Sequence, residues 1–525
     1  MEHAGFLHAF PARREPPEAR RWWGLGVICC AMFISGIDMT IVNVALPDIS
    51  RDLGAGINEL QWVLDGFLVA LGALLLLGTG LGDRFGRRRV FVGAFLLFGV
   101  ASGLAALSDD PIQLIGARVL MGAAVAGIMP TALALITVMF PVEERARAIS
   151  IWAVVAGVAI GVGPVLGGVL VASLGWPAVF LVNIPVAILA APAGLALLPE
   201  SRRPGAPPLD LGGVALSTIG LGGVVFALIE GPSGGWGQPV VIAAAVAGIA
   251  GLAAFVVFER RRLHPLFDLG VLVRPRVIAG AVSLFGCYLA FFGVLFLLPQ
   301  YLQYVQGRSP AVAGLAILPL GFAMVPAAIA SGRMVARWGP RATLVASLCG
   351  MAAATALLLL IGPATPLGLV LVAMGLFGAC EVGALVPATS VVLNDLGTEK
   401  AGDGGAVNQL ARQIGGATGV ALVGSLFGAL YRSALSGGLA GLPAPARATA
   451  QDSIEGARQV AEGLGADAKA ALIAQADLSF DVGARAGVAL CLAALLAAAL
   501  VAFIGLGRPA EAPAAAAPAP AQPTR

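Results

Sequence analysis

Fourteen long apolar runs constrain the fold of this 525-residue chain more than any other feature of its sequence. A helix needs about 20 mostly apolar residues to cross a bilayer, and each run reaches about that length. The runs are too long and too continuous for the strands of a membrane barrel. Each therefore predicts a helix, because backbone polar groups in lipid must be satisfied within their own segment. The runs lie at 22–46, 60–81, 89–107, 111–138, 148–172, 176–198, 211–230, 239–258, 277–300, 311–332, 342–361, 366–390, 405–431 and 483–506.

The composition agrees with an all-α polytopic membrane protein. The chain is 58% hydrophobic and 12% charged, with a mean hydropathy of +0.92, whereas soluble domains are about 45–50% apolar and about 25% charged. Too little polar surface is left for a cytosolic enzyme, a disordered scaffold or a secreted disulfide domain. The net charge of +3 is too small for a nucleic-acid binder.

Residues typical of catalysis or metal binding do not cluster in this sequence. The six Cys form no CxxC pair, and His3, His8 and His264 lie in terminal or loop segments without partners. No GxxxxGK[ST] phosphate loop is present. We therefore expect no enzyme, no catalytic residues, no metal and no cofactor, with the proton gradient rather than ATP as the source of energy.

Basic residues alternate in density along the chain and set its orientation. Clusters such as Arg87–Arg89 and Arg260–Arg262 fall in every second loop, while the short loops between carry Arg51 and Arg308. Cytoplasmic loops are rich in Arg and Lys, so both termini are predicted to be cytoplasmic. The chain has two Lys and 71 Gly, a bias typical of a GC-rich bacterial genome. The predicted location is thus a bacterial cytoplasmic membrane.

Two loops repeat one another at an offset of 253 residues. TGLGDRFGRRR (Thr79 to Arg89) aligns without gaps with GRMVARWGPR (Gly332 to Arg341). This recurrence predicts two parallel halves, as in many transporters. The predicted division is a tail at 1–21, a six-helix half at 22–198, two inserted helices with their loops at 199–276, a second half at 277–506 with a long outer loop at 432–482, and a disordered tail at 507–525.

Five segments, in order and on the expected helices, carry a family resemblance. They read GIDMTIVNVALPDI (Gly36 to Ile49), LGDRFGRRR (Leu81 to Arg89), RVLMG (Arg118 to Gly122), GVGPVLGG (Gly161 to Gly168) and WPAVFLVNIP (Trp176 to Pro185). With them the chain resembles the major facilitator superfamily, and within it the fourteen-helix drug/proton antiporters. Thr79, Met121 and Pro177 depart from the usual residues of these motifs.

The resemblance assigns mechanical roles to two of these motifs. Gly161, Gly163, Pro164, Gly167 and Gly168 match the antiporter motif, whose small residues let a neighbouring helix approach and whose proline bends the helix. The loop residues Asp83, Arg84, Gly86, Arg87 and Arg88 match the gating loop, in which the glycine permits a tight turn and the aspartate can clamp a gate. Generic close packing and plain positive-inside topology are the alternatives.

Ionisable residues inside predicted spans are costly, so each is a functional candidate. Asp38 lies about 14 Å and Arg118 about 10 Å from the same membrane surface, close enough in depth to pair across the bundle. We assign both to proton coupling, with a fixed structural ion pair as the alternative. Asp65 is a second candidate for protonation or for binding a cation, with a polar residue at the outer water boundary as the alternative.

The substrate cavity is expected to be apolar, with one acid near the membrane midplane. Glu381 lies about 22 Å from the outer end of its helix, and no basic residue lies within one helical turn of it. It would bind a cationic substrate or a proton, or else be a neutral hydrogen-bonded structural acid. The aromatic candidates for the cavity wall are Trp62, Phe67, Tyr288, Phe291 and Phe292, because aromatic faces attract organic cations.

The function predicted from these features is proton-coupled efflux of hydrophobic drugs or antibiotics, cationic ones included, across the cytoplasmic membrane by alternating access. The alternatives are a dedicated exporter of a self-made natural product or siderophore, and then a non-transporting membrane protein or membrane enzyme. The predicted partners are a small hydrophobic substrate, protons and the lipid bilayer, without nucleic acid, and the predicted working form is a monomer.

Overall fold

The computed structural model describes residues 18–202, 209–261, 270–271, 274–396, 401–439 and 441–507, and every regular element in these ranges is helical. The helices of the first part of the chain are α1 (Glu18–Leu53), α2 (Ile57–Phe85), α3 (Arg87–Ala106), α4 (Pro111–Met139), α5 (Val142–Leu174), α6 (Ala178–Leu181), α7 (Asn183–Leu197), α8 (Leu211–Gly234) and α9 (Pro239–Arg260). The later ones are α10 (Pro275–Tyr304), α11 (Pro310–Leu358), α12 (Leu367–Leu396), α13 (Ala401–Leu435), η2 (Ser436–Leu439), α14 (Ala444–Asp452), α15 (Ile454–Glu462) and α16 (Ala466–Gly505).

The described ranges hold fourteen membrane spans, as the hydropathy predicts. Thirteen helical segments are long and apolar enough to cross a bilayer, with α6 and α7 together forming one of them. The longest, α11, has 49 residues and is interrupted at Gly339, where φ is 80° and ψ is 163°. Because 49 helical residues are enough for two spans, the segments before and after Gly339 each supply one.

The two repeated loops contain the same kind of turn. Gly86, between α2 and α3, has φ 111°, and Gly339, within α11, has φ 80°. Positive φ values of this size are readily adopted by glycine and by few other residues. The repeat seen in the sequence thus corresponds to a shared backbone device that reverses the chain after the second helix of each half.

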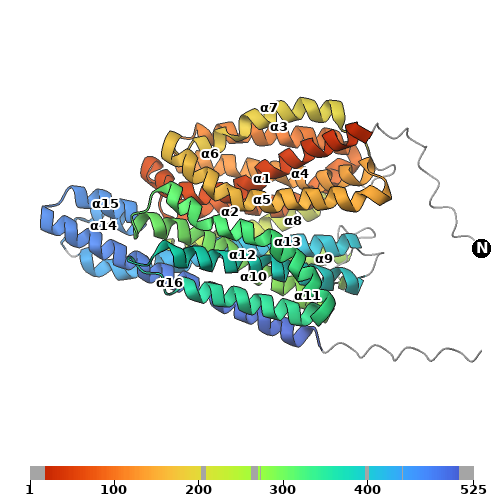
Figure 1. Ribbon diagram of the computed structural model, residues 1–525. Helices are drawn as coiled ribbons and strands as arrows, with labels where there is room; N and C mark the ends of the chain where they lie inside the picture. The colour runs from red at the N-terminus through yellow and green to blue at the C-terminus, as the bar shows by residue number, and fades with distance from the viewer. Residues whose placement is uncertain are drawn as a thin grey trace, which may run out of the picture.

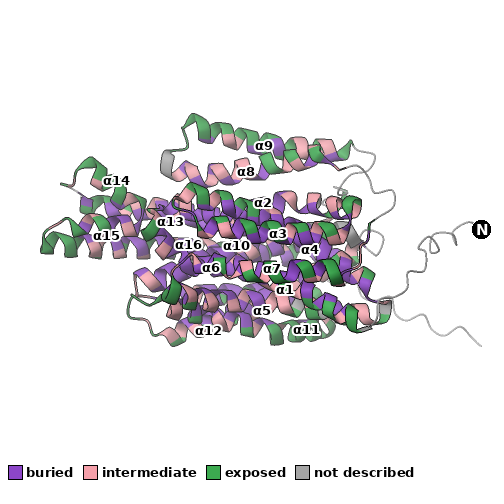
Figure 2. Cartoon of the chain, turned by 90° about the horizontal axis from the view of Figure 1, so that it is seen from above, coloured by how far each residue is buried: buried purple, intermediate pink, exposed green. Residues whose placement is uncertain are grey.

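Helix packing groups the spans into two bundles and an appended pair. In the first bundle, α1 packs on α5 and α7, and α4 packs on α2 and α3. In the second bundle, α10 packs on α12, α13 and α16, and α11 packs on α12 and α16. The bundles meet mainly where α5 packs on α11 and α2 on α13. The inserted pair, α8 and α9, lies side by side along one flank, with α8 against α2 and α13 (Figure 2).

The molecule has two distinct ends. α1 begins and α16 ends at the same end, which we call the basic end because the arginine-rich turn around Gly86 lies there (Figure 1). At the opposite end project α14 and α15, which we call the cap (Figure 1). The cap packs on the extended start of α16, and Arg458 donates to the Tyr304 carbonyl oxygen at 2.9 Å.

The predicted outer loop at 432–482 differs in detail from the structure. Residues 444–475 of this loop belong to three helices, because α14 ends at Asp452 and the Ser453 side chain caps α15 by accepting from the Gly456 amide at 2.9 Å. The last span begins its helix at Ala466, well before the apolar run at 483–506. Its polar first turns extend beyond the apolar segment, which hydropathy alone does not detect.

Candidate transport cavity and its charged residues

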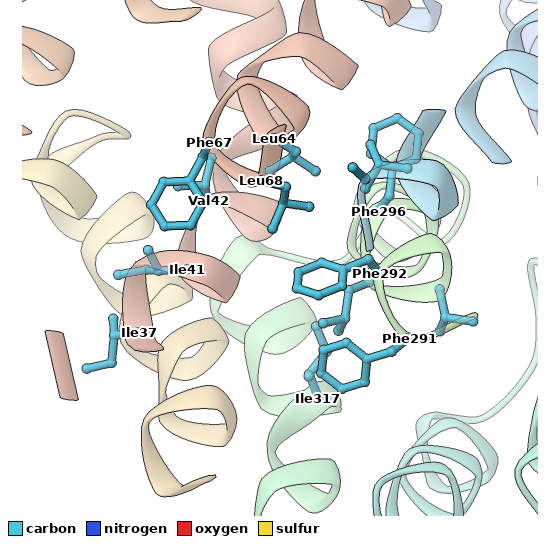
Figure 3. Close-up of a cluster of buried hydrophobic side chains, with 14 of the residues drawn as sticks. Ile37, Ile41, Val42, Leu64, Phe67, Leu68, Phe291, Phe292, Phe296 and Ile317 are labelled. Carbon is cyan, nitrogen blue, oxygen red and sulfur yellow. The ribbon is translucent and has the colours of Figure 1, made fainter. Parts of the chain in front are cut away.

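A cavity of about 450 Å³ lies between the two bundles. Its lining comes from α1, α4 and α5 of the first bundle and from α10, α11, α12 and α13 of the second. The wall is mostly apolar, with Met39, Met129 and Trp152 facing Phe291 and Phe292. Figure 3 shows the buried apolar side chains of α1 and α2 on one side and those of α10 and α11 on the other.

Two glycines of the antiporter motif, together with Pro164, form the seam that closes the cavity toward the cap. A Cβ on Gly161 would lie 2.4 Å from Cα of Gly321, and one on Gly168 would lie 2.4 Å from the Pro310 carbonyl oxygen. Pro164 lies against Gly314 of α11 in the same seam. A Cβ on Gly314 would come within 2.1 Å of the Pro164 carbonyl oxygen. The α5 and α11 backbones therefore touch along their cap-end halves, as small residues allow in membrane helices.

The remaining two glycines of the motif face α1 instead. A Cβ on Gly163 would lie 2.2 Å from Thr40 Oγ1, and one on Gly167 would lie 2.7 Å from Ile41 Cγ1. One turn toward the basic end, Gly157 lines the cavity, and a Cβ there would meet nothing within 4 Å. The motif is thus tightly packed on two sides at the cap end and opens into the cavity below.

Hydrogen bonds between the bundles also gather at the cap end. Gln303 Nε2 donates to the Val44 carbonyl oxygen at 3.0 Å, and Tyr304 Oη donates to the Pro47 carbonyl oxygen at 3.4 Å. Gln61 Nε2 donates to the Ala421 carbonyl oxygen at 3.0 Å. Together with the glycine seam, these bonds describe a conformation closed at the cap end, with the cavity toward the basic end.

Asp38 and Arg118 meet as the depth argument predicts. They form an ion pair through Asp38 Oδ2 and Arg118 Nη1, and their side chains are 0% and 1% exposed. Arg118 Nε also donates to the Val63 carbonyl oxygen at 2.9 Å, and its Cζ lies 4.5 Å from the Phe67 ring centroid. Such multiple partners are what a buried ion pair needs to offset desolvation.

A neutral network supports the other oxygen of Asp38. Asn183 Nδ2 lies 3.4 Å from Asp38 Oδ1 and 2.9 Å from Ser102 Oγ, and Ser102 Oγ donates to the Phe180 carbonyl oxygen at 2.8 Å. Asn183 was not among the predicted site residues, although it lies in the recognised segment WPAVFLVNIP. The sequence feature that could have identified Asn183 as a site residue is its polar amide inside an otherwise apolar span.

Asp65 lies apart from this pair. Its residue exposure is 0%, and neither carboxyl oxygen has a hydrogen-bond partner among the described residues. Helical spacing puts Asp65 on the same face of α2 as Gln61 and Gly72, which contact α13 through Ala421 and Gln413. Asp65 therefore faces the contact between the two bundles rather than a water boundary.

Glu381 has a basic neighbour on the facing helix, which the sequence prediction missed. Both Glu381 of α12 and Arg412 of α13 line the cavity, and the Tyr288 side chain lies next to each of them. Arg412 Nη1 is 3.5 Å from Tyr288 Oη, and its Cζ is 5.5 Å from the Tyr288 ring centroid. The absence of a base within one turn of Glu381 along its own helix says nothing about α13, so the cavity carries both charge signs.

Two of the predicted aromatic cavity residues lie elsewhere. Trp62 Nε1 donates to Glu230 Oε1 at 3.0 Å and joins α2 to α8, while Phe67 packs under Arg118. Of the described residues, the aromatic side chains that line the cavity are Trp152, Tyr288, Phe291 and Phe292. The prediction missed Trp152 because its helix gave no sign of which face turns inward.

The gating loop is held within the first bundle in this conformation. Asp83 Oδ1 pairs with Arg87 Nη2 at 2.8 Å, and Arg88 Nη1 donates to the Leu195 carbonyl oxygen at 3.2 Å. Arg88 also lies 3.6 Å from Glu200 through its Nε, and Arg84 stacks at 5.8 Å on Phe85. These partners all belong to α2, α3, α7 and the segment that follows α7, so the aspartate does not clamp the two bundles together here.

Comparison with known proteins identifies the family. The pattern that defines the Major Facilitator Superfamily matches residues 28–420. The chain belongs to the major facilitator superfamily. It is 40% identical to the puromycin resistance protein pur8 of Streptomyces alboniger, over 78% of this chain and 82% of that protein. It is 31% identical to the multidrug efflux pump LfrA of Mycolicibacterium smegmatis, over 96% of this chain and 99% of that protein.

Solved structures agree with this facilitator-superfamily fold. A bacterial homologue of the human lysosomal transporter Spinster, in an inward-facing and occupied conformation, matches with a TM-score of 0.64 at 15% identity, covering 94% of this chain and 98% of that one. The transporter PepTSo matches with a TM-score of 0.62 at 14% identity, covering 94% and 99%. As a member of the major facilitator superfamily, the protein is a membrane transporter and not an enzyme.

Proposed function

We propose that the protein exports hydrophobic drugs or antibiotics across the bacterial cytoplasmic membrane in exchange for protons. The observation that carries this proposal is an apolar cavity between the two bundles with the buried Asp38–Arg118 pair beside it, one residue from the cavity-lining Met39. The names of the relatives, which are resistance and efflux proteins, support the direction of transport. The protein works as a monomer, needs no cofactor and draws its energy from the proton gradient.

The basic end is proposed to be cytoplasmic, with both termini on that side. The arginines of the turn at Gly86 and those near Gly339 lie at this end, as the positive-inside rule requires. The conformation is then inward-facing, with the cavity open toward the cytoplasm and sealed on the outside. Alternating access would rock the bundles about the cavity, so that the seam of α5 and α11 opens while the basic end closes.

Proton coupling is proposed to work through the charge on Asp38. A proton arriving on the carboxylate removes its attraction for Arg118, while Arg118 keeps the Val63 carbonyl and the Phe67 ring as partners. Loss of the ion pair frees α1 to move relative to α4. Because α1 also carries Thr40 and Met39 of the cavity wall, protonation and the shape of the cavity are linked.

The gating loop is proposed to act in the other half of the cycle. In the outward-facing state Asp83 would exchange Arg87 for a partner on the second bundle and hold the cytoplasmic side closed. Gly86 makes this possible, because its turn places the start of α3 directly beside the end of α2.

A second candidate is the export of a natural product that the host itself makes. Among the relatives are the tetracenomycin C resistance and export protein of Streptomyces glaucescens and a probable actinorhodin transporter of Streptomyces coelicolor, each 34% identical. The two functions share one mechanism and differ in the range of substrates.

Resistance measurements in a host that lacks its own pumps test the proposal. Expression of the full chain should raise the inhibitory concentration of several unrelated apolar antibiotics and lower their accumulation in the cells. A protonophore should abolish the difference in accumulation between cells with and without the protein. Resistance to a single compound class would favour the dedicated exporter. No change for any compound, at membrane expression verified by blot, would refute export.

A further inference from the structure

The cavity contains one arginine with unused hydrogen-bonding capacity, and we propose that Arg412 makes it a binding site for aromatic substrates that carry an ionised acidic group. The groups meant are a carboxylate or a phenolate attached to a planar ring system. This inference rests on the proposed export function and assigns a substrate class to it. It also replaces the expectation, drawn from Glu381, that the cavity favours cations.

The partners of Arg412 are neutral. Its guanidinium donates to Gln409 Oε1 and lies 3.5 Å from Tyr288 Oη. Among the described residues Arg412 forms no ion pair, although it is close enough to Glu381 for the two charges to attract each other. A guanidinium has five N–H donors in a planar fork that suits a carboxylate. At least two donors therefore stay available to a ligand in the cavity, because the acid that lines it, Glu381, is hydrogen-bonded to Tyr288 rather than to Arg412.

The other buried arginine offers no such site. Arg118 is 1% exposed, paired with Asp38 and covered by the Phe67 ring. Arg412 is instead partly exposed and lines the cavity itself. Of these two intramembrane arginines, one is committed to an acid within its bundle and the other is free to meet a ligand.

Neutral donors surround Arg412 on its own helix. Gln409 and Gln413 lie three residues before and one residue after it, and both line the cavity. Their amide N–H₂ groups can donate to the same anion, so α13 presents a row of donors. Glu381 of α12 is hydrogen-bonded to Tyr288, which leaves the free donors of α13 as the place for a negative group.

Aromatic residues next to this row fit a planar substrate. The rings of Phe291 and Phe292 lie 5.3 Å apart in a T-shaped arrangement, and that of Tyr288 lies 6.0 Å from Phe291. Ring systems stack favourably against such faces, which adds binding energy beyond the charge. An acidic polycyclic compound could thus place its rings on α10 and its anionic group on α13.

Three fluorescent dyes of known charge test the inference on the purified full chain. Fluorescein is the anion, rhodamine 123 the cation on the same tricyclic ring system, and Nile red the neutral control. Binding is measured by fluorescence polarisation in lipid nanodiscs, at a mildly alkaline pH where fluorescein is ionised. The wild type should bind fluorescein more tightly than rhodamine 123, and Arg412→Gln should weaken fluorescein binding by roughly 10- to 100-fold.

Matched variants separate recognition from structure. Arg412→Lys keeps the charge but loses the planar fork, so it should bind fluorescein more tightly than Arg412→Gln and more weakly than the wild type. Nile red binding should stay within about 2-fold in both variants. Tighter binding of rhodamine 123 than of fluorescein by the wild type would overturn the inference. This comparison uses the wild-type protein alone and does not depend on the folding of any variant. An equal loss for all three dyes in Arg412→Gln would overturn it too, by showing a structural role. Failure of the wild type to bind Nile red would instead count against the proposed function.

Discussion

At the scale of single residues, the buried acids of the spans differ in how well their charge is supported. Asp38 has an ion pair and an amide, Glu381 has a tyrosine and a more distant arginine, and Asp65 has no hydrogen-bond partner among the described residues. A buried polar group without a partner costs about 1–3 kcal/mol. A residue kept at such a cost is a candidate for a role in another state of the cycle.

We predict that Asp65→Leu stabilises the protein while it slows transport. Removal of the unpartnered carboxyl group should raise the free energy of unfolding by about 1–3 kcal/mol, because the leucine is buried without a polar group to satisfy. The melting temperature in detergent and the rate of substrate efflux measure the two effects. Gln61→Leu is the matched control on the same helix face, and it should destabilise because the hydrogen bond to Ala421 is lost. Normal efflux from Asp65→Leu would show that Asp65 has no part in transport.

At the scale of helices, the glycine seam between α5 and α11 determines which side of the molecule is closed. Backbone contact is possible there because Gly161 and Gly321 have no side chains, and larger residues would keep the helices apart. The same helix faces the open cavity one turn away, at Gly157. Neighbouring glycines of one helix therefore differ in role: Gly161 permits close packing of two helices, and Gly157 lines the cavity.

Gly161→Ala should shift the molecule toward the state that is open at the cap end. The added methyl group overlaps Cα of Gly321, and overpacking of this kind costs about 1–3 kcal/mol. A cysteine introduced at the buried position Val44, in a background without other cysteines, reports the shift through labelling from outside by a membrane-impermeant thiol reagent. Gly157→Ala is the control and should label like the parent. Equal labelling in both variants would contradict the claim that the contact of Gly161 with Gly321 keeps the cap end closed.

Most of the helical architecture could be predicted from the sequence, because hydropathy is a one-dimensional signal. All fourteen runs correspond to spans, and the turn at Gly339 follows from its likeness to the loop at Gly86. Which face of each helix turns inward could not be predicted, since the spans are apolar on all sides. For that reason the sequence placed Trp62 and Phe67 in the cavity, whose lining in this conformation does not include them, and it did not indicate Trp152 or the approach of Arg412 to Glu381.

At the scale of the whole molecule, the cap links the second bundle to the first. The carboxyl group of Asp452 in α14 packs against Gly56, at the start of α2. A Cβ on Gly56 would lie 2.4 Å from Asp452 Oδ2. Burial raises the pKa of the Asp452 carboxyl group, and nearby Glu59 raises it further, while Arg432 opposes both. Burial likewise raises the pKa of Glu455, against the effect of Arg458 and Arg51.

Docking of the cap should therefore tighten as the pH on that side falls. An acid whose pKa is raised in the docked state binds its proton more readily there, so docking is favoured below the raised pKa and weakened as the pH rises through it. Spin labels at the exposed positions Ala448 and Asp109 measure the separation of the cap from the first bundle. Asp452→Asn should reduce the pH dependence. A cap that docks more tightly at alkaline pH would contradict this account.

Substrate-triggered proton release tests the central claim, which is that Asp38 couples proton entry to substrate exit through its pair with Arg118. Everted vesicles are given an acidic interior, and a pH-sensitive dye follows proton release when the exported substrate is added. Wild type should release protons, Asp38→Glu should retain part of the response because it keeps a carboxyl group, and Asp38→Asn should release none at matched membrane expression. Normal proton release from Asp38→Asn would contradict the account.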